Sequence, residues 1–167
     1  IEEMLEFYAN FLGETLEPIL AQVQLDFVSF SEDMAFKSGP FISPEMFARF
    51  FKPHYRQLAE RFQRHGIRSF VVDSDGYPAP LIPHLLEAGV CGIHPCEVAA
   101  GMDVVKLRRQ YGKDLRLWCG IDKRVLTQDR AAIDAELRAK VPAMLESGGY
   151  IPQIDHSVPP NVPFDNF

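Results

Sequence analysis

Several features are missing or scarce in this sequence, and each absence narrows the class of protein. No apolar run approaches the roughly 20 residues of a membrane-spanning helix, and no charged-then-apolar signal peptide opens the chain. Basic residues are outnumbered, with 17 Lys and Arg against 23 Asp and Glu and a formal net charge of −6. This balance argues against nucleic acid or an anionic membrane as the main partner, because both attract basic surfaces. Cysteine is scarce at three residues, and an odd number without a secretion signal predicts reduced thiols in a cytoplasmic protein.

Internal repeats and low-complexity tracts are also absent, and the remaining composition is that of an ordinary globular domain. Hydrophobic residues make up 47% of the 167 residues and charged residues 24%, which suits one domain over residues 1–167 with a sizeable core. The chain begins with Ile1 rather than Met and stops at Phe167 without a closing helix. We therefore expect it to be a piece of a longer protein.

Two kinds of segment alternate along the chain. Apolar residues at helical spacing, with Ser, Asp or Pro at the start and Gly at the end, predict helices. Short apolar or β-branched runs predict strands. We expect Pro18 to break or bend the first helix, Pro53 to kink the second, and Ser43 and Asp103 to cap two helices. In the last helix we expect Ile133, Leu137, Val141, Met144 and Leu145 to face inward. The expected helices are 1–23, 44–65, 80–88, 103–111 and 129–147, and the expected strands are 26–30, 69–72, 92–94, 115–119 and 150–154.

Strands that alternate with helices indicate βαβ units and a parallel sheet, which leaves a barrel or a doubly wound sheet. The Gly-rich phosphate turn of a dinucleotide-binding sheet is missing. A closed barrel needs eight strands and about 250 residues. The sequence therefore predicts an α/β fold that is a partial (β/α)8 TIM barrel, with about five βα units of the C-terminal part.

Polar residues follow every expected strand, at the edge where parallel α/β folds carry their active sites. The opposite loops are instead Gly-centred stops such as Gly66 and Gly89, which argues against loops that are simply polar. The polar clusters are Ser31, Glu32 and Asp33; Asp73, Ser74, Asp75 and Gly76; His94, Cys96 and Glu97; Gly120, Asp122 and Lys123; and Asp155 and His156.

These clusters supply the candidate site residues. Paired carboxylates shift each other's pKa for acid–base work or bind a cation, and histidine titrates near neutral pH. Each has a structural alternative: residues 73–76 form a plain turn, Glu97 favours a helix start, His94 packs at a strand end, and Asp122 pairs with Lys123. The candidates are His156, Asp73 and Glu97 as catalytic residues; Glu32, Asp33, Asp75, His94, Asp122 and Lys123 as substrate-binding residues; and Asp73, Asp75, Glu97 and His156 as ligands of a divalent metal.

Four segments in order resemble a known family. The first three segments are Phe41–Phe47 with Pro53, Asp73–Gly76 and Gly120–Lys123. The last segment, Gly149–Ile151 with Asp155, His156, Pro159 and Pro160, is similar to a closing Gly-His…Pro strand and loop. Together they resemble the uroporphyrinogen decarboxylase superfamily from Asp26 onward. The resemblance implies a TIM barrel whose cleft holds a tetrapyrrole or a methyl-carrying partner. It implies either cofactor-free decarboxylation of uroporphyrinogen or methyl transfer between a corrinoid protein and a thiol or folate, often with zinc.

The resemblance transfers to single positions as follows. His156 matches the decarboxylase histidine near the substrate's carboxylates, whereas residues 29–33 contain no Tyr where the decarboxylase has one. The decarboxylase's arginine-rich motif and central aspartate belong to earlier strands that this chain lacks. The His-x-Cys pair of the zinc methyltransferases falls on Asp73 and Asp75, and their last thiol ligand falls near His156, so a Cys-rich zinc site is not supported. The pattern is closest to the methyltransferase-like branch.

Three functional hypotheses follow. The first is corrinoid-linked methyl transfer, with a corrinoid on a partner protein or a divalent metal as cofactor. The second is uroporphyrinogen III decarboxylation in porphyrin and haem biosynthesis, although the acidic clusters suit a polycarboxylate substrate poorly. The third is an incomplete, non-catalytic barrel that self-associates through its open strand edges.

Overall fold

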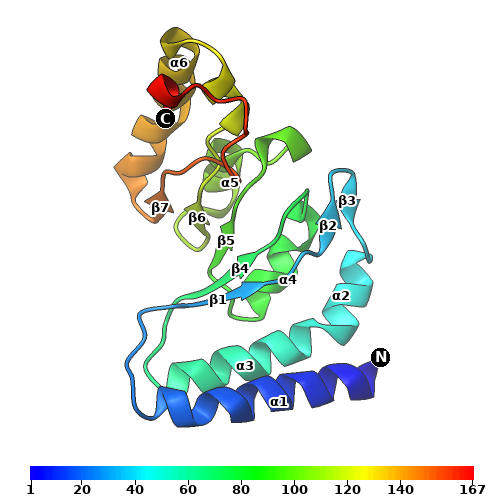
Figure 1. The fold of residues 1–167 in the computed structure, drawn as a ribbon. Helices are drawn as coiled ribbons and strands as arrows, with labels where there is room; N and C mark the ends of the chain where they lie inside the picture. The colour runs from blue at the N-terminus through cyan, green and yellow to red at the C-terminus, as the bar shows by residue number, and fades with distance from the viewer.

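A computed structural model describes all of residues 1–167 and contains the expected parallel sheet (Figure 1). The sheet has five strands in the order β1-β4-β5-β6-β7, and every neighbouring pair is parallel. With helices between its strands, this is a partial TIM barrel, as the sequence predicts. The strands are β1 (Val28–Ser31), β4 (Phe70–Asp73), β5 (Gly92–His94), β6 (Arg116–Trp118) and β7 (Tyr150–Ile151).

The helices begin and end where local chemistry predicts. Ser43 accepts a hydrogen bond from the Met46 N–H, and Asp103 accepts from two N–H groups of the next turn, so both residues cap as expected. Gly66 adopts φ +82°, the left-handed conformation that ends the helix before it. The helices are α1 (Glu2–Leu20), α2 (Pro44–Phe50), α3 (Lys52–Arg64), α4 (Ile82–Glu87), α5 (Val104–Tyr111) and α6 (Arg130–Ser147), and 3-10 turns lie at Ala79–Leu81, Val98–Ala100, Lys123–Thr127 and Phe164–Asn166.

The sheet has one covered face and one open face. Side chains of Phe70, Val72, Ile93 and Leu117 point toward the helices and are buried. The alternate residues of the strands face the other side, and Ile151 there is 56% exposed. In a barrel the open face corresponds to the interior. Side chains on it therefore lead up to the carboxyl edge of the strands, where the polar loops begin.

Aromatic packing joins the first strands to their helices. Phe30 of β1 lies 4.6 Å from Phe70 of β4 and 5.9 Å from Phe62 of α3, measured between ring centroids. Phe62 is 1% exposed, and Tyr55 of the same helix completes the cluster. Each such pair adds about 0.5–1.5 kcal/mol beyond its buried area. This cluster fixes the height of β1 relative to β4, and thus the positions of the side chains at their ends.

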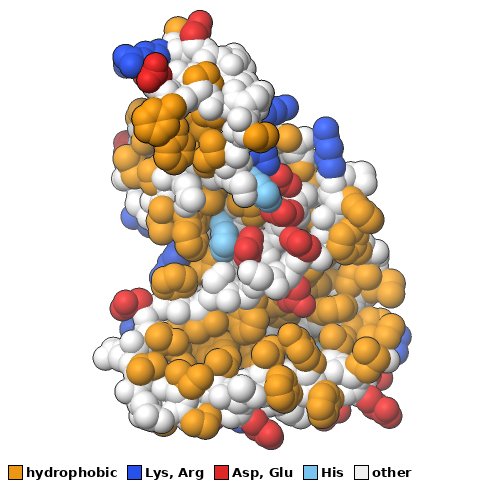
Figure 2. All heavy atoms as spheres, viewed as in Figure 1, with side chains coloured by type: hydrophobic (Ala, Val, Ile, Leu, Met, Phe, Trp, Pro, Cys, Tyr) orange, Lys and Arg blue, Asp and Glu red, His pale blue; other side chains and the backbone are white.

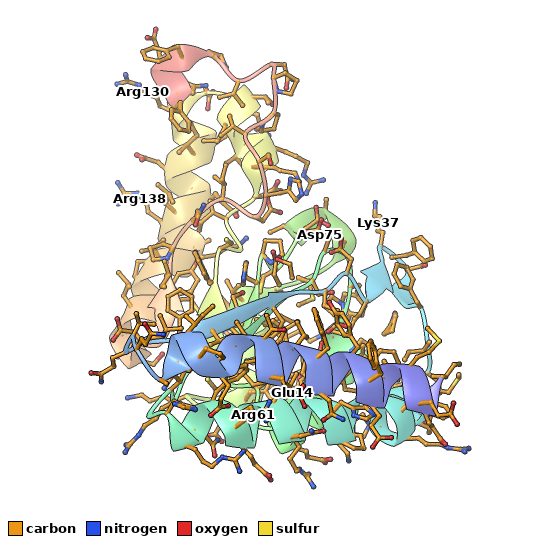
Figure 3. The ribbon with its side chains drawn as sticks, turned by 60° about the horizontal axis from the view of Figure 1, so that its bottom comes forward. Glu14, Lys37, Arg61, Asp75, Arg130 and Arg138 are labelled. Carbon is orange, nitrogen blue, oxygen red and sulfur yellow. The ribbon has the colours of Figure 1, made fainter.

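Helix α1 packs along α3 on the outer side of the molecule (Figures 1 and 3). Arg61 of α3 makes an ion pair with Glu17 of α1 at 3.3 Å, and its guanidinium lies where a side chain at Gly13 would have to go. Pro18 lies inside α1, which continues to Leu20, so Pro18 does not break the helix, and a bend there stays a prediction. None of the helices is long and apolar enough to cross a membrane.

Two parts of the fold differ from expectation. The segment 44–65 is two helices rather than one kinked helix, because the chain turns at Phe51 and Pro53 occupies the first turn of α3, where its missing N–H costs nothing. A small antiparallel hairpin, β2 (Ala35–Phe36) with β3 (Gly39–Pro40), was not expected. Strands of two residues are too short to show alternation.

The orientation of α6 also corrects the sequence analysis. Met144 is fully buried as expected, whereas Leu137 is 38% exposed and Leu145 is 53% exposed. Helix α6 packs mainly on α5 and on the 3-10 turn Lys123–Thr127. It therefore buries a narrow row of residues, and Leu137 and Leu145 lie beside that row.

Candidate functional site

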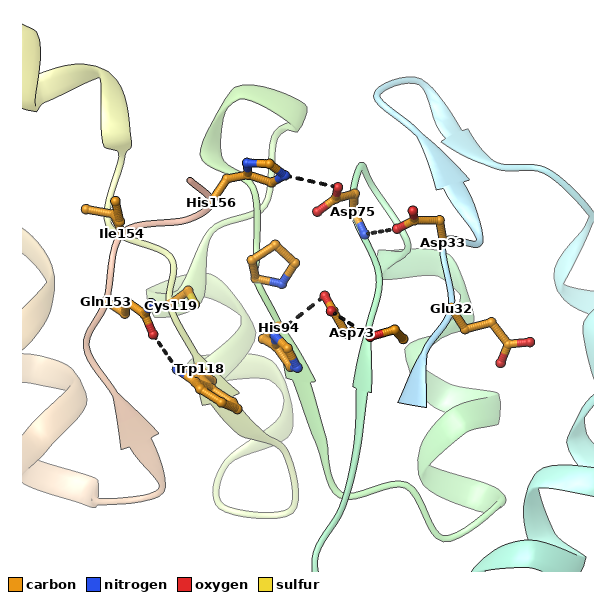
Figure 4. A pocket seen from close by; sticks show the side chains of 12 residues that line it. Glu32, Asp33, Asp73, Asp75, His94, Trp118, Cys119, Gln153, Ile154 and His156 are labelled. Carbon is orange, nitrogen blue, oxygen red and sulfur yellow. Dashed lines mark hydrogen bonds and ion pairs between the residues drawn. The ribbon is translucent and has the colours of Figure 1, made fainter. Parts of the chain in front are cut away.

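A cleft of about 410 Å³ opens at the carboxyl ends of the strands (Figure 4). Four carboxylates, two histidines and the chain's only tryptophan line it, and no Lys or Arg does. Figure 2 shows acidic and histidine side chains gathered in a hollow in the middle of this face. The charged and aromatic residues of the cleft are Glu32, Asp33, Asp73, Asp75, His94, His156 and Trp118.

We call four connected side chains the inner group: Ser31, Asp73 and His94, which line the cleft, and Ser29, which lies two residues earlier on β1 and contacts His94. Ser31, Asp73 and His94 lie in register on adjacent strands. The Ser31 hydroxyl donates to Asp73 Oδ2 at 3.1 Å, and His94 Nδ1 lies 3.5 Å from Asp73 Oδ1. The other ring nitrogen, Nε2, is 3.1 Å from Ser29 Oγ. Both nitrogens of His94 are thus engaged within the protein.

Burial and charge act in opposite directions on His94. Its side chain is 14% exposed, and the Trp118 ring lies 4.5 Å away, centroid to centroid. Burial lowers the pKa of His94, and the neighbouring Asp73 carboxylate offsets part of that effect. His94 is therefore held as a neutral imidazole near pH 7.

The rim of the cleft holds an exposed pair, Asp75 and His156. His156 Nε2 lies 3.4 Å from Asp75 Oδ2, and both side chains are about two-fifths exposed, at 41% and 39%. The Asp75 backbone N–H donates to Asp33 Oδ1 at 3.0 Å, which ties the first two loops together. Burial, together with the nearby Glu97 carboxylate, raises the pKa of Asp75. This pair presents an imidazole and a carboxylate at the rim of the cleft.

Glu32 stands apart from these contacts. Its carboxylate makes no ion pair or side-chain hydrogen bond, and burial raises its pKa. It adds negative charge to the cleft without a positive neighbour. The negative potential of the cleft is therefore left for a ligand to neutralise.

Glu97 and Lys123 lie behind the cleft rather than in it. Glu97 accepts a hydrogen bond from the Gly76 N–H at 3.0 Å and pairs with Lys123 Nζ at 3.1 Å. Burial alone would raise the pKa of Glu97, but these hydrogen bonds lower it. Asp122 pairs with Arg124 at 2.6 Å, so the alternative in which Asp122 pairs with Lys123 is wrong. These residues hold the loops together and do not reach the cleft lining.

Asp155 connects three loops beneath the rim. Its side chain is fully buried, and its two oxygens accept from the Val98 N–H at 2.7 Å and the Lys123 N–H at 2.9 Å. Its own N–H donates to the Ile121 carbonyl at 2.8 Å. The next residue is His156, so these bonds fix the position of the His156 backbone at the rim of the cleft.

The expected metal ligands do not converge. Asp73 is engaged by Ser31 and His94, Asp75 pairs with His156, and Glu97 pairs with Lys123. No group of three or more His, Cys, Asp or Glu side chains is placed to hold a metal ion. Cys96 and Cys119 do not add thiolate ligands, since burial raises the pKa of Cys119 to about 12 and also raises that of Cys96. The residues present do not fit a divalent metal.

Sequence reasoning missed three residues that shape this site. Ser29 and Trp118 lie within strands, where a serine or tryptophan has no distinguishing signal. Nothing in the sequence assigns Asp155, the neighbour of His156, a role of its own. The period-two alternation from Asp73 and Ser31 places Ser29 on the same face. Proximity to His94, however, depends on strand order, which one sequence does not show.

The fold and the location of the cleft define the class: a (β/α)-barrel chain with a polar site at the carboxyl ends of its strands. The family model for uroporphyrinogen decarboxylase (URO-D) matches residues 1–167, so the chain belongs to that family. No curated protein matches. Among solved structures, a methyltransferase from Methanosarcina mazei has a similar fold, with a TM-score of 0.62 and 19% identity over 99% of this chain. This chain spans 44% of that protein's length.

Proposed function

We propose that this chain forms part of the mouth of a methyltransferase of the URO-D family that works with a corrinoid-carrying partner. The charge of the cleft carries the proposal. Four carboxylates and no Lys or Arg line it, and such a surface suits a polycarboxylate substrate poorly because carboxylates are bound by Arg and Lys. The methyltransferase with a similar fold is in keeping with this choice.

His156 and Asp75 have the central role in this proposal. A thiol that accepts a methyl group must lose its proton, and a positioned histidine is the commonest group to take it. His156 is exposed at the rim, and Asp75 lies 3.4 Å away to stabilise the imidazolium that results. Asp73, held by Ser31, orients the acceptor from the floor. Glu97 lies behind the cleft, and its role is indirect: it holds Lys123 and the turn at Gly76 in place.

The methyl group itself would come from the corrinoid of the partner protein, which supplies that chemistry when it docks at the barrel mouth. This chain would bind the acceptor, exclude water with Trp118 and move the proton. Because the candidate ligands do not converge, we derive no metal-dependent step. A cytoplasmic setting is in keeping with three cysteines that form no disulfide.

For the alternative in which the barrel is incomplete, we further propose that the chain self-associates. Strands β1 and β7 each have a neighbour on one side, so their other edges carry unpaired backbone groups. The open face adds apolar side chains, with Phe27 49% exposed and Ile151 56% exposed. Gel filtration tests this directly: a dimer is expected, and a stable monomer at high concentration would refute it.

The test of the methyl-transfer proposal is a titration with methylcobalamin, followed by the fluorescence of Trp118. This residue is the only tryptophan and it lines the cleft, so quenching beyond that of free tryptophan amide reports binding there. We expect saturable quenching that weakens in Asp75→Ala and His156→Ala. Absence of quenching, together with turnover of uroporphyrinogen, would replace the proposal with decarboxylation.

A further inference from the structure

We propose that Ser29 is a nucleophile activated by His94 and Asp73, and that the inner group hydrolyses carboxylic esters with an apolar acyl chain. This activity differs from methyl transfer, and it uses neither His156 nor Glu97. It rests on the connected contacts of the inner group and on the hollow beside Ser29.

The contacts link Ser29 to His94, and His94 to Asp73. His94 Nδ1 faces Asp73 Oδ1 at 3.5 Å, so we assign the ring proton to Nδ1, beside the carboxylate, and leave Nε2 as an acceptor. The Ser29 hydroxyl, 3.1 Å from Nε2, is therefore placed to donate to it. Ser31 donates to the second oxygen of Asp73 at 3.1 Å and fixes that carboxylate. A nucleophile, a base and a group that orients the base are the parts of a serine hydrolase, which unrelated folds assemble on different elements.

The base and the nucleophile also have the exposure that these roles require. His94 is 14% exposed beneath the Trp118 ring, whereas Ser29 is exposed on the open face of the sheet. Burial lowers the pKa of His94, so the imidazole is neutral and able to accept a proton. The reacting atom of the group, Ser29 Oγ, is thus open to a substrate while the base is shielded from water.

The hollow beside Ser29 indicates the substrate class. Val71, the register partner of Ser29 on β4, lines a hollow of about 490 Å³ together with Phe27, Trp118 and Ile151. These four side chains suit an apolar chain, and the one charged residue of the lining, Arg116, donates a hydrogen bond to the Ser69 hydroxyl. An ester whose carbonyl carbon meets Ser29 Oγ would place its acyl chain in this hollow.

The reaction balances without a metal or a redox partner. As Ser29 Oγ bonds to the carbonyl carbon, its proton passes to His94 Nε2 and the carbonyl π electrons move to oxygen. Collapse breaks the bond to the alkoxide, which leaves with the proton from His94, and Ser29 keeps the acyl group. Water, deprotonated by His94, then releases the acid and restores Ser29. The sum is ester plus water to acid plus alcohol.

Two measurements on the whole chain test the proposal. The wild-type protein is treated with an alkyl fluorophosphonate, which loses fluoride to an activated serine, and the labelled residue is mapped by mass spectrometry. Hydrolysis of p-nitrophenyl butyrate is then compared among the wild type, Ser29→Ala, His94→Gln and Ser38→Ala. Ser38 is an exposed serine in the turn between β2 and β3 and serves as the matched control. Thermal melts show which variants are folded.

We expect label on Ser29 and loss of about 10²-fold or more in hydrolysis for Ser29→Ala and His94→Gln, with Ser38→Ala like the wild type. Mapping on the wild type does not depend on any variant folding. The proposal is overturned if no serine is labelled, or if the label lies on several serines alike. It is equally overturned if hydrolysis is the same in folded Ser29→Ala.

Discussion

Replacing Asp155 by alanine should destabilise the protein more than any other loss of one carboxylate at the site. The Asp155 oxygens accept hydrogen bonds from the Val98 and Lys123 N–H groups at 2.7 and 2.9 Å, and the side chain is fully buried. A buried N–H without an acceptor costs about 1–3 kcal/mol. For two such groups we expect a loss of about 3 kcal/mol, a large share of the roughly 5–15 kcal/mol that holds a domain folded.

Urea and thermal unfolding measure this loss. At about 2–4 °C for each kcal/mol, the midpoint temperature should fall by about 6–12 °C. Asp155→Asn keeps the size and one acceptor, so its loss should be smaller. Asp114→Ala is the matched control, because Asp114 is exposed and its side chain accepts no hydrogen bond. If Asp155→Ala unfolds within about 0.5 kcal/mol of Asp114→Ala, the reasoning about the three loops is wrong.

Three further predictions concern backbone, charge and packing. Gly76→Ala should lose about 2 kcal/mol or more in urea unfolding, since φ is +77° and the added Cβ would lie 2.5 Å from the Ala35 carbonyl oxygen. Asp75→Asn should be more stable than wild type at pH 8, because a folded-state pKa raised by burial makes ionisation of Asp75 oppose folding. That difference should disappear as the pH falls below the ordinary pKa of aspartate; equal urea midpoints at pH 8 would contradict it. Met144→Ala should lose about 2–5 kcal/mol, while Leu145→Ala, at 53% exposure, should change the free energy of unfolding little; equal losses would show that α6 is rotated.

The fold was predictable because its signals are local and repeated. Ser43 and Asp103 cap the helices that their positions indicate, and Gly66 ends one. The apolar run predicted as a strand at residues 69–72 lies in β4, where Phe70 and Val72 are buried. The rule that polar sites lie at the carboxyl ends of parallel strands groups Asp73, Asp75, His94 and His156, and these four residues do line one cleft.

What the sequence did not reveal depends on distances between segments far apart in the chain. Glu97 follows the third predicted strand as His94 does, yet it turns toward Lys123 while His94 faces the cleft. Asp155 and His156 are neighbours in the chain, yet the side chain of Asp155 is fully buried and that of His156 is 41% exposed. The pairing of Ser29 with His94 requires β1, β4 and β5 to lie side by side in that order. Residue types and their spacing in one sequence do not show which segments lie side by side in the fold.

The most direct test of the proposed function is methyl transfer from methylcobalamin to a simple thiol, 2-mercaptoethanol, followed by the absorbance change of the corrinoid. The wild type is compared with His156→Ala and with His54→Ala, which removes a histidine of α3 that is absent from the cleft lining. We predict a rate above that of the uncatalysed mixture, reduced about 10²-fold or more in His156→Ala and retained in His54→Ala. A wild-type rate equal to the uncatalysed one, or equal rates in the two variants, would contradict the proposal.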